Sequence, residues 1–345
     1  MKPMDISRRA AAVLVIAMLA ACGGGGGGGG GGDTGGGGGG GDGGGGGGGG
    51  GSNPGTPVAV TGQYRLQPAA TDFNGALAAM NAQGAQGYAF LSSFFPSGNA
   101  STFGDFYVSD TAHASSRLDY AMEPVVTTAD AALAQMNARG AQGYAYKAGA
   151  AYGTTMPIEQ RSIYVKDTSR SVTYSYERLA STSSTTKATY EAQLNAQGAR
   201  GYRIVGPMIV GGEQFNLYSK DNSGATYSYS LRDWVGNFGV ADGAALQQQL
   251  TEMGAQGYMY QGGMALQGQT VVQFEKSSAQ NGAVEYQVEQ STQTTLDGML
   301  ARMNERAAQG FFLFSDVIAN DGKTYTISVK NAVALRHPLA GISFP

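Results

Sequence analysis

Few side chains in this sequence could carry covalent or metal chemistry. Cys22 is the only cysteine, so the chain offers no disulfide, thiolate metal cluster or redox pair of its own. The two histidines, His113 and His337, stand near no recognisable nucleophile pattern, and two imidazoles cannot form the usual three-ligand zinc sites. The remaining candidate chemistry is modification of the Cys22 thiol, which depends on the residues before it.

The first 21 residues have the three parts of an export signal. A basic start is followed by an apolar run and then by Leu-Ala-Ala-Cys at positions 19–22. This ending resembles the lipobox of bacterial lipoproteins, in which a diacylglycerol group is placed on the cysteine before the signal is removed. The apolar run of about 12 residues is too short for a membrane anchor, which needs about 20. We predict a signal peptide over residues 1–21 and lipid attachment at Cys22.

The residues after Cys22 indicate where the protein is held. Gly23 stands where Asp would be expected for retention at the inner membrane, and the resemblance to Gram-negative lipoproteins then implies the outer membrane, on its periplasmic face or at the cell surface. Residues 23–51 contain 26 glycines among 29 residues. A chain without side chains to bury stays disordered, so residues 22–57 are predicted to be a polyglycine tether.

Charge and composition exclude several partners. Removal of the signal takes three basic residues and one acidic residue, which leaves a net charge of −5. Nucleic-acid binding needs a basic surface, so no nucleic-acid partner is expected. A glycine homopolymer also lacks the fixed strand–loop–helix geometry that holds phosphate, and no metal or other cofactor is predicted.

One nine-residue motif occurs five times after the tether. The copies are MNAQGAQGY at 80, MNARGAQGY at 136, LNAQGARGY at 194, LTEMGAQGY at 250 and MNERAAQGF at 303. Each follows a helical pattern, precedes two strand-like runs and is introduced by an alternating aromatic strand, which predicts a strand–helix–strand–strand unit. This unit resembles a small, uncharacterised bacterial βαββ domain with the signature L-N-x-x-G-x-x-G-[WY]. The resemblance implies a compact α+β fold and does not indicate an activity.

Each motif position has a structural interpretation. In the first copy, Phe73, Leu77 and Met80 form one apolar helix stripe, and Thr71 or Asp72 can cap the helix. The first glycine is expected to end the helix in a left-handed conformation, with a looser end at Ala307 in the fifth copy. The second glycine is expected to allow close passage of the next strand, and the aromatic residue after it to cover the core. The repeated asparagines are expected to bond the helix exit; a ligand site is the alternative.

The predicted organisation is five tandem units between the tether and a short tail. Their boundaries are 58–117, 118–172, 173–225, 226–283 and 284–331, and the C-terminal tail is 332–345. The connections after 164–167 and 218–221 have the composition of tight hairpins, so the last strand of one unit is expected to pair with the first strand of the next. The fold class is α+β, with units that share sheets and stack as a short solenoid or close into a ring. Asp110, Asp167 and Asp221 recur at these joints as turn residues; calcium ligands are the alternative.

These observations favour a non-enzymatic envelope lipoprotein whose repeat array binds a protein, glycan or peptidoglycan partner. An envelope hydrolase with a carboxylate pair is the first alternative, with its acidic residues scattered over several units at Glu177, Glu213, Glu275, Glu285 and Glu289. It would require a deep pocket lined by carboxylates from two neighbouring units, and one unit decorated unlike the others, which the sequence does not show. A purely structural envelope protein is the second alternative. Alternating tyrosines at 174 and 176 and at 227 and 229 are either a binding stripe or packing between units.

Overall fold

The computed structural model describes residues 60–96, 102–152, 159–181, 185–234, 242–266 and 269–332. The predicted signal peptide, the lipid site at Cys22, the polyglycine tether and His337 lie outside these residues. Within them the protein has the predicted mixed α+β architecture, with strand, helix, strand and strand repeated five times. No helix among the described residues is long and apolar enough to cross a membrane.

The five units are named here by their elements. Unit 1 contains β1 (Gly62–Pro68), α1 (Phe73–Gly84), β2 (Ala89–Phe94) and β3 (Gly104–Asp110), followed by the short 3-10 helix η1 (Thr111–His113). Unit 2 contains β4 (Leu118–Pro124), α2 (Ala129–Ala141), β5 (Ala145–Tyr152) and β6 (Glu159–Asp167). Unit 3 contains β7 (Tyr174–Ala180), α3 (Lys187–Ala199), β8 (Arg203–Val210) and β9 (Glu213–Asp221). Unit 4 contains β10 (Tyr227–Asp233), α4 (Gly243–Gly254), β11 (Met259–Leu266) and β12 (Gln269–Ser277). Unit 5 contains β13 (Glu285–Gln290), α5 (Leu296–Ala308), β14 (Phe312–Ile318) and β15 (Thr324–Lys330).

Each helix starts at a polar cap. The caps are Asp72, Thr128, Thr186, Asp242 and Thr295, and each side chain accepts a hydrogen bond from the backbone N–H three residues later. Such a cap satisfies one of the free N–H groups of the first turn. The predicted cap at Asp72 is therefore confirmed. The apolar stripe of this helix differs, because its buried residues are Ala76, Met80 and Gly84 while Phe73 and Leu77 are less buried.

The prediction that neighbouring units share a sheet is wrong. The structure has five separate antiparallel three-stranded sheets, with orders β1-β3-β2, β4-β6-β5, β7-β9-β8, β10-β12-β11 and β13-β15-β14. The third strand of each unit is the central strand, so both of its edges are already paired within its own unit. It has no free edge for the first strand of the next unit, although the connection between them is short.

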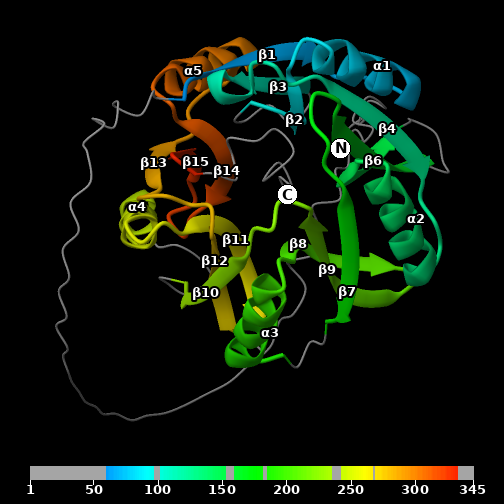
Figure 1. Cartoon of the computed structure of the whole chain (residues 1–345). Coiled ribbons are helices and arrows are strands. Elements are labelled where there is room, and N and C mark those ends of the chain that lie inside the picture. The colour runs from blue at the N-terminus through cyan, green and yellow to red at the C-terminus, as the bar shows by residue number, and fades with distance from the viewer. Residues whose placement is uncertain are drawn as a thin grey trace, which may run out of the picture.

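Units are joined instead by a helix that packs on the next sheet. Helices α1 to α4 pack on β4, β7, β10 and β13 respectively, and α5 packs on β1. Figure 1 shows the helices around the outside, the sheets closer to the centre, and α5 (orange) beside β1 (blue) although they lie at opposite ends of the described chain. The apolar clusters also lie across joints, and one of them contains Met303 of unit 5, Tyr64 of unit 1 and Tyr120 of unit 2.

A tyrosine of each first strand is hydrogen-bonded to the preceding unit. The five hydroxyls accept a backbone N–H beside the bulge of the preceding second strand, over 2.6–3.0 Å, in the pairs Tyr120–Phe90, Tyr176–Tyr146, Tyr229–Ile204, Tyr286–Tyr260 and Tyr64–Leu313. A β-bulge interrupts the regular ladder, so this amide needs another acceptor. Tyr176 and Tyr229 are therefore buried between units, which agrees with the packing interpretation of the alternating tyrosines.

The motif asparagines also bind the next unit rather than their own helix exit. Asn81 donates to Tyr120 O (3.2 Å) and accepts from Tyr120 N (2.7 Å). Asn137 and Asn195 bind Tyr176 and Tyr229 in the same way, and Asn304 binds Tyr64. In unit 4 the motif has Thr251, and Gln247, one turn earlier, makes the equivalent bonds to Tyr286 O and Val288 N. The expectation of a bond to the helix exit is thus corrected.

The two motif glycines have exchanged their expected roles. The second glycine takes the left-handed conformation, with φ between 82° and 90° at Gly87, Gly143, Gly201, Gly257 and Gly310. The first glycine lies where a Cβ would collide with the backbone of the next unit's first strand, as at Gly140 against Tyr174 O. Ala307 replaces this glycine in unit 5, where it is fully buried and ends the helix as the others do, so the expected looser end is also wrong. In the first strand of unit 1, Gly62 takes the place of the residue that lies against the first motif glycine at the other joints. Because Gly62 has no Cβ, the ring of Phe312 occupies the space beside it.

Candidate functional site

A large cavity lies where unit 5 meets unit 1. Its volume is about 890 Å³. Its walls come from α5, from β14 and β15, from the segment that joins β13 to α5, and from the end of β2 in unit 1. Because residues 93–95 of unit 1 form part of the wall, the complete cavity requires contact between the first and last units. A ligand of small-molecule or oligosaccharide size fits the usual volume range of such cavities.

Two positions distinguish this part of unit 5 from the same part of unit 4. In unit 4, Trp234 follows the first strand and its ring occupies the place where Gly263 would carry a Cβ. In unit 5, Ser291 is equivalent to Trp234 and Asp316 is equivalent to Gly263. Ser291 N donates to Thr324 O, and Trp234 N donates to Thr270 O in the same way. The register places Gly263 opposite Val272 as it places Asp316 opposite Thr326.

Unit 4 has a smaller pocket between α4 and the end of β10, with a volume of about 320 Å³. Beside it, the indole of Trp234 fills the space next to Gly263, and unit 5 has no ring at the equivalent position.

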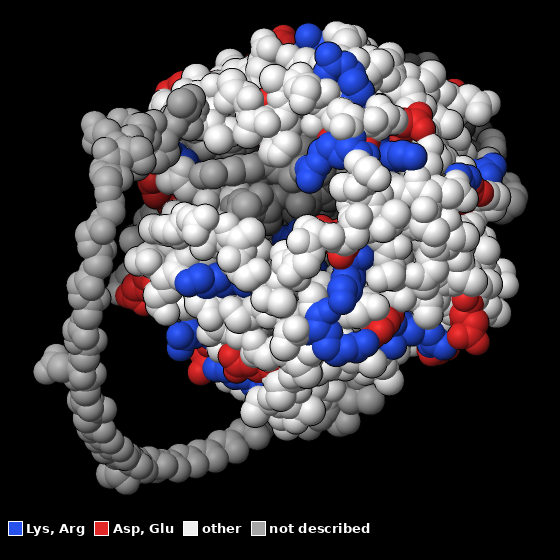
Figure 2. Space-filling model, in the orientation of Figure 1, with Lys and Arg blue, Asp and Glu red and all other residues white. Residues whose placement is uncertain are grey.

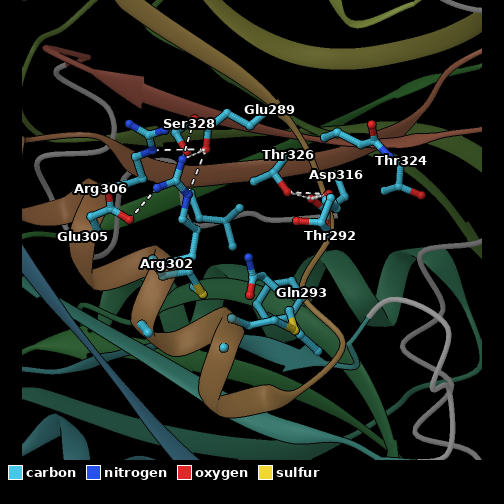
Figure 3. A pocket seen from close by; sticks show the side chains of 18 of the residues that line it. Glu289, Thr292, Gln293, Arg302, Glu305, Arg306, Asp316, Thr324, Thr326 and Ser328 are labelled. Carbon is cyan, nitrogen blue, oxygen red and sulfur yellow. Dashed lines mark hydrogen bonds and ion pairs between the residues drawn. The ribbon is translucent and has the colours of Figure 1, made fainter.

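One end of the cavity is an ionic cluster. Arg302 donates from Nε and Nη2 to Glu289 over 2.6–3.1 Å, and Arg306 Nε donates to Glu289 Oε2 over 3.2 Å. Arg302 also forms an ion pair with Glu305. Figure 3 shows these four side chains gathered together. Since Glu289 and Glu305 hold the guanidinium of Arg302 on three nitrogens, this end has little unsatisfied positive charge.

The other end is a carboxylate among hydroxyl groups. Asp316 Oδ1 accepts from Thr326 Oγ1 (2.6 Å) and from Ser291 Oγ (3.5 Å). Figure 3 places Thr292 and Thr324 near the same end, apart from the arginine cluster. The side chain of Asp316 is exposed, and it faces the open space of the cavity. Because protein surrounds this space, the carboxyl is partly desolvated, which raises its pKa.

Apolar side chains complete the floor and the rim. Met299, Met303 and Leu313 line the floor. At the rim, Phe95 is 50% exposed and Ile318 is 74% exposed, which is unusual for side chains of this size in this molecule. The ring of Phe95 is held edge-on against Phe103, with 5.5 Å between the ring centroids. The site therefore combines a flat apolar rim with polar groups inside.

The carboxylates singled out in the sequence do not come together. Each is paired with its own cation, in the pairs Glu177–Arg200, Glu213–Arg178, Glu275–Arg203, Glu285–Lys330 and Glu289–Arg302. Only Glu289 lines the cavity. The acidic groups of the cavity, Glu289, Glu305 and Asp316, all belong to unit 5, whereas the hydrolase hypothesis required carboxylates from two units.

The joint residues show no metal centre. Asp167 accepts hydrogen bonds from Ser116, Arg117 and Ser169, and His113 contacts Asp110 in the turn between units 1 and 2. In the part of the chain that the structure describes, no three His, Cys, Asp or Glu side chains stand close enough to hold a metal ion. The hydrogen bonds of Asp167 and Asp221 are those of turn residues.

The sequence motifs do not indicate Asp316, Ser291 or the two arginines, and they do not distinguish one unit from the others. The structure shows that unit 5 differs by the carboxylate of Asp316. A position-by-position comparison of the second strands finds this difference, because the other units have Ser93, Gly149, Pro207 and Gly263 there. Its consequence depends on the contact with unit 1, which no local pattern indicates.

On the face seen in Figure 2, uncharged residues cover most of the surface and the charged side chains are dispersed. Comparison with known proteins gives one family: residues 51–207 match the model of the PT dipeptide repeat lipoproteins. This is less than half of the chain, and the chain itself contains no Pro-Thr dipeptide. The similarity supports a lipoprotein with repeats, and hence anchoring to a membrane. No curated protein and no solved structure matches the chain.

Proposed function

We propose that this protein is a non-enzymatic lipoprotein of the outer membrane whose five units form a closed ring and bind a glycan in the cavity between units 5 and 1. The observation that carries the proposal is this cavity, which has walls from both unit 5 and unit 1 and contains no ring like that of Trp234 in unit 4. A purely structural role would give no reason for Asp316, a carboxylate that only unit 5 has at this position of the second strand.

The lipid anchor is supported by the sequence Leu-Ala-Ala-Cys before the cleavage point and by the similarity to a lipoprotein family. Gly23 after Cys22 favours the outer membrane. In growing cells the original chain should incorporate labelled palmitate, whereas the Cys22→Ser variant, which lacks the acceptor thiol, should not. Equal labelling of that variant would contradict lipid attachment at Cys22. Protease treatment of intact cells then decides orientation, because cleavage without lysis places the array at the cell surface.

The closed ring is supported by the joint between α5 and β1. It repeats the features of the four covalently connected joints: the asparagine bonds from Asn304 to Tyr64 and the tyrosine bond from Leu313 N to Tyr64 Oη. An open stack would leave Tyr64 and the apolar face of α5 in water. Burial of such a face is the main source of stability for helix–sheet packing.

A glycan is the partner that the lining of the cavity favours. Sugars present several hydroxyls on a ring with apolar faces, and the cavity offers hydroxyl, amide and carboxylate groups behind an exposed phenyl ring. The carboxylates that line the cavity are poorly placed for hydrolysis of a glycosidic bond. Both oxygens of Glu289 are held by arginines, and Asp316 stands at the other end of the cavity (Figure 3). A glycosidase needs two free carboxyl groups facing one bond.

The test is glycan binding by the mature lipidated chain in detergent, measured with a panel of fluorescent envelope oligosaccharides. The double variant Ser291→Trp with Asp316→Gly places in unit 5 the indole that unit 4 has beside Gly263, as a plug of the cavity. It should lose at least about tenfold in affinity, because loss of a few well-placed contacts costs about 1.4 kcal/mol or more. Ser181→Trp places the same residue at the equivalent position of unit 3 and is the matched control. Equal binding by the plugged protein, or no binding by any oligosaccharide, would refute the proposal.

A further inference from the structure

The carboxylate of Asp316 is peculiar to unit 5. At the equivalent position of the second strand, the other units have Ser93, Gly149, Pro207 and Gly263. None of these carries a charge. The sheet therefore does not need an acidic group at this place, and Asp316 has no role in the packing that the five units share.

The hydrogen bonds of Asp316 leave one oxygen available. Both hydroxyl donors, from Thr326 and Ser291, reach Oδ1. Among the described residues no donor contacts Oδ2, and no cation forms an ion pair with the group. Asp316 is exposed to the cavity, so this oxygen is open to a donor on a ligand.

The charge of the cavity is also unbalanced at this end. Two arginines face three carboxylates, and the arginine contacts go to Glu289 and Glu305. The remaining negative charge is that of Asp316. An ammonium group within hydrogen-bonding distance would satisfy Oδ2 with a charge-assisted bond, which is roughly twice as strong as a neutral one.

The surroundings of Asp316 select what carries that ammonium group. Thr292, Thr324 and Gln293 present polar groups beside it in Figure 3, and a purely aliphatic amine would leave them unpaired. A sugar ring supplies hydroxyls for these groups and an apolar face for Phe95 at the rim.

We infer that this cavity recognises an amino sugar with a free ammonium group, which donates to Asp316. The inference rests on the proposed glycan function and adds a specificity to it. Acetylation of the sugar nitrogen removes the charge and adds bulk, so the site should distinguish two glycans that differ only in N-acetylation.

The experiment compares the glucosamine tetramer with the N-acetylglucosamine tetramer by isothermal titration against the mature lipidated chain at about pH 7. We expect the unacetylated tetramer to bind about tenfold to a hundredfold more tightly, as a hydrogen bond to a charged group implies. Asp316→Asn should remove this preference. Asp316→Ser, which places the residue of unit 1 here, should do the same and guards against a folding defect in either variant.

The control is Asp297→Asn, an equal change of charge in the exposed first turn of α5, outside the cavity. It should keep the preference. A preference that survives in both Asp316 variants would overturn the inference, since the charge would then act from elsewhere. Equal binding of both tetramers overturns the inference and leaves the proposed glycan function standing. If neither tetramer binds, the inference is overturned, and the panel of envelope oligosaccharides then decides the glycan function by itself.

Discussion

The joint between units 3 and 4 contains a buried ion pair, whereas the pair Arg178–Asp130 between units 2 and 3 is largely exposed. Arg203 Nε donates to Glu275 Oε1 over 2.7 Å, with the two side chains 12% and 2% exposed, and Tyr229 Oη donates to Glu275 Oε2 over 3.0 Å. At the joint between units 4 and 5 the equivalent positions have Met259 and Val329. The chain therefore supplies its own apolar replacement for this pair.

The expected effect follows from the desolvation of both charges. Glu275→Val alone leaves a buried guanidinium and a tyrosine hydroxyl without an acceptor, and removal of one partner of such a pair costs about 3–5 kcal/mol. Arg203→Met alone should cost a similar amount, because it leaves a buried carboxylate. The double variant should return to within about 1 kcal/mol of the original chain or become more stable. Arg203 Nη2 is buried without a hydrogen-bond partner, and this favours the apolar pair.

Urea unfolding followed by tryptophan fluorescence is a suitable assay, because Trp234 is the only tryptophan and belongs to unit 4. The three variants and the original chain form a double-mutant cycle, and the slope of each transition shows whether the same surface unfolds. If the double variant is as unstable as the single variants, the reasoning is refuted, and the pair contributes net stability to this joint.

Three further predictions concern the repeated joint. Tyr64→Phe leaves the Leu313 amide buried without an acceptor, at a cost of about 1–3 kcal/mol, so hydrogen exchange at that amide should accelerate several-fold to about a hundredfold. Unchanged exchange would contradict the hydrogen bond between unit 5 and unit 1. Gly140→Ala should lower the free energy of unfolding by about 1–3 kcal/mol, because the added Cβ collides with the backbone of the next unit at Tyr174. Ala307→Gly should lower it by only about 0.5–1 kcal/mol, through the greater backbone freedom of glycine. Equal losses in urea unfolding would argue against close contact between the first motif glycine and the next strand. Burial lowers the pKa of Lys147 to about 7. Above that pH the unfolded chain binds more protons than the folded chain, so the free energy of unfolding should rise between about pH 7 and 10. Lys147→Met should flatten this rise, and an unaltered dependence on pH would show that Lys147 does not cause it.

The sequence predicted the content of the units better than their connection. The motif and its spacing were sufficient for the order strand, helix, strand, strand, because hydrophobic period and cap chemistry act within a few residues. The sheet pairing failed for a physical reason that is not local. A short connection such as residues 168–173 favours a hairpin only if the strand before it has a free edge, and β6 is central in its sheet.

The glycines show the same limit at single residues. A glycine near a helix end has two possible reasons, a left-handed conformation or a close neighbour, and the sequence does not distinguish them. In the motif, Gly87 has the first reason and Gly84 has the second, since Leu118 of the next unit lies against it. The contact that decides belongs to another unit, and so it could not be read from the motif alone.

The closing joint connects the fold to the proposed binding. Units 1 to 5 follow one another along the chain, but α5 and β1 are held together only by non-covalent contacts, among them the bonds of Asn304 and Leu313 to Tyr64. The cavity has walls from both sides of this joint, so a bound glycan adds contacts that exist only when unit 5 is in contact with unit 1. A ligand that binds only the closed form stabilises it by about 2.7 kcal/mol at a concentration of 100 Kd. Exchange at the Leu313 amide should therefore slow on addition of the glycan in the original chain and stay unchanged in the plugged variant. If exchange slows equally in both, the stabilising contact lies elsewhere than in this cavity.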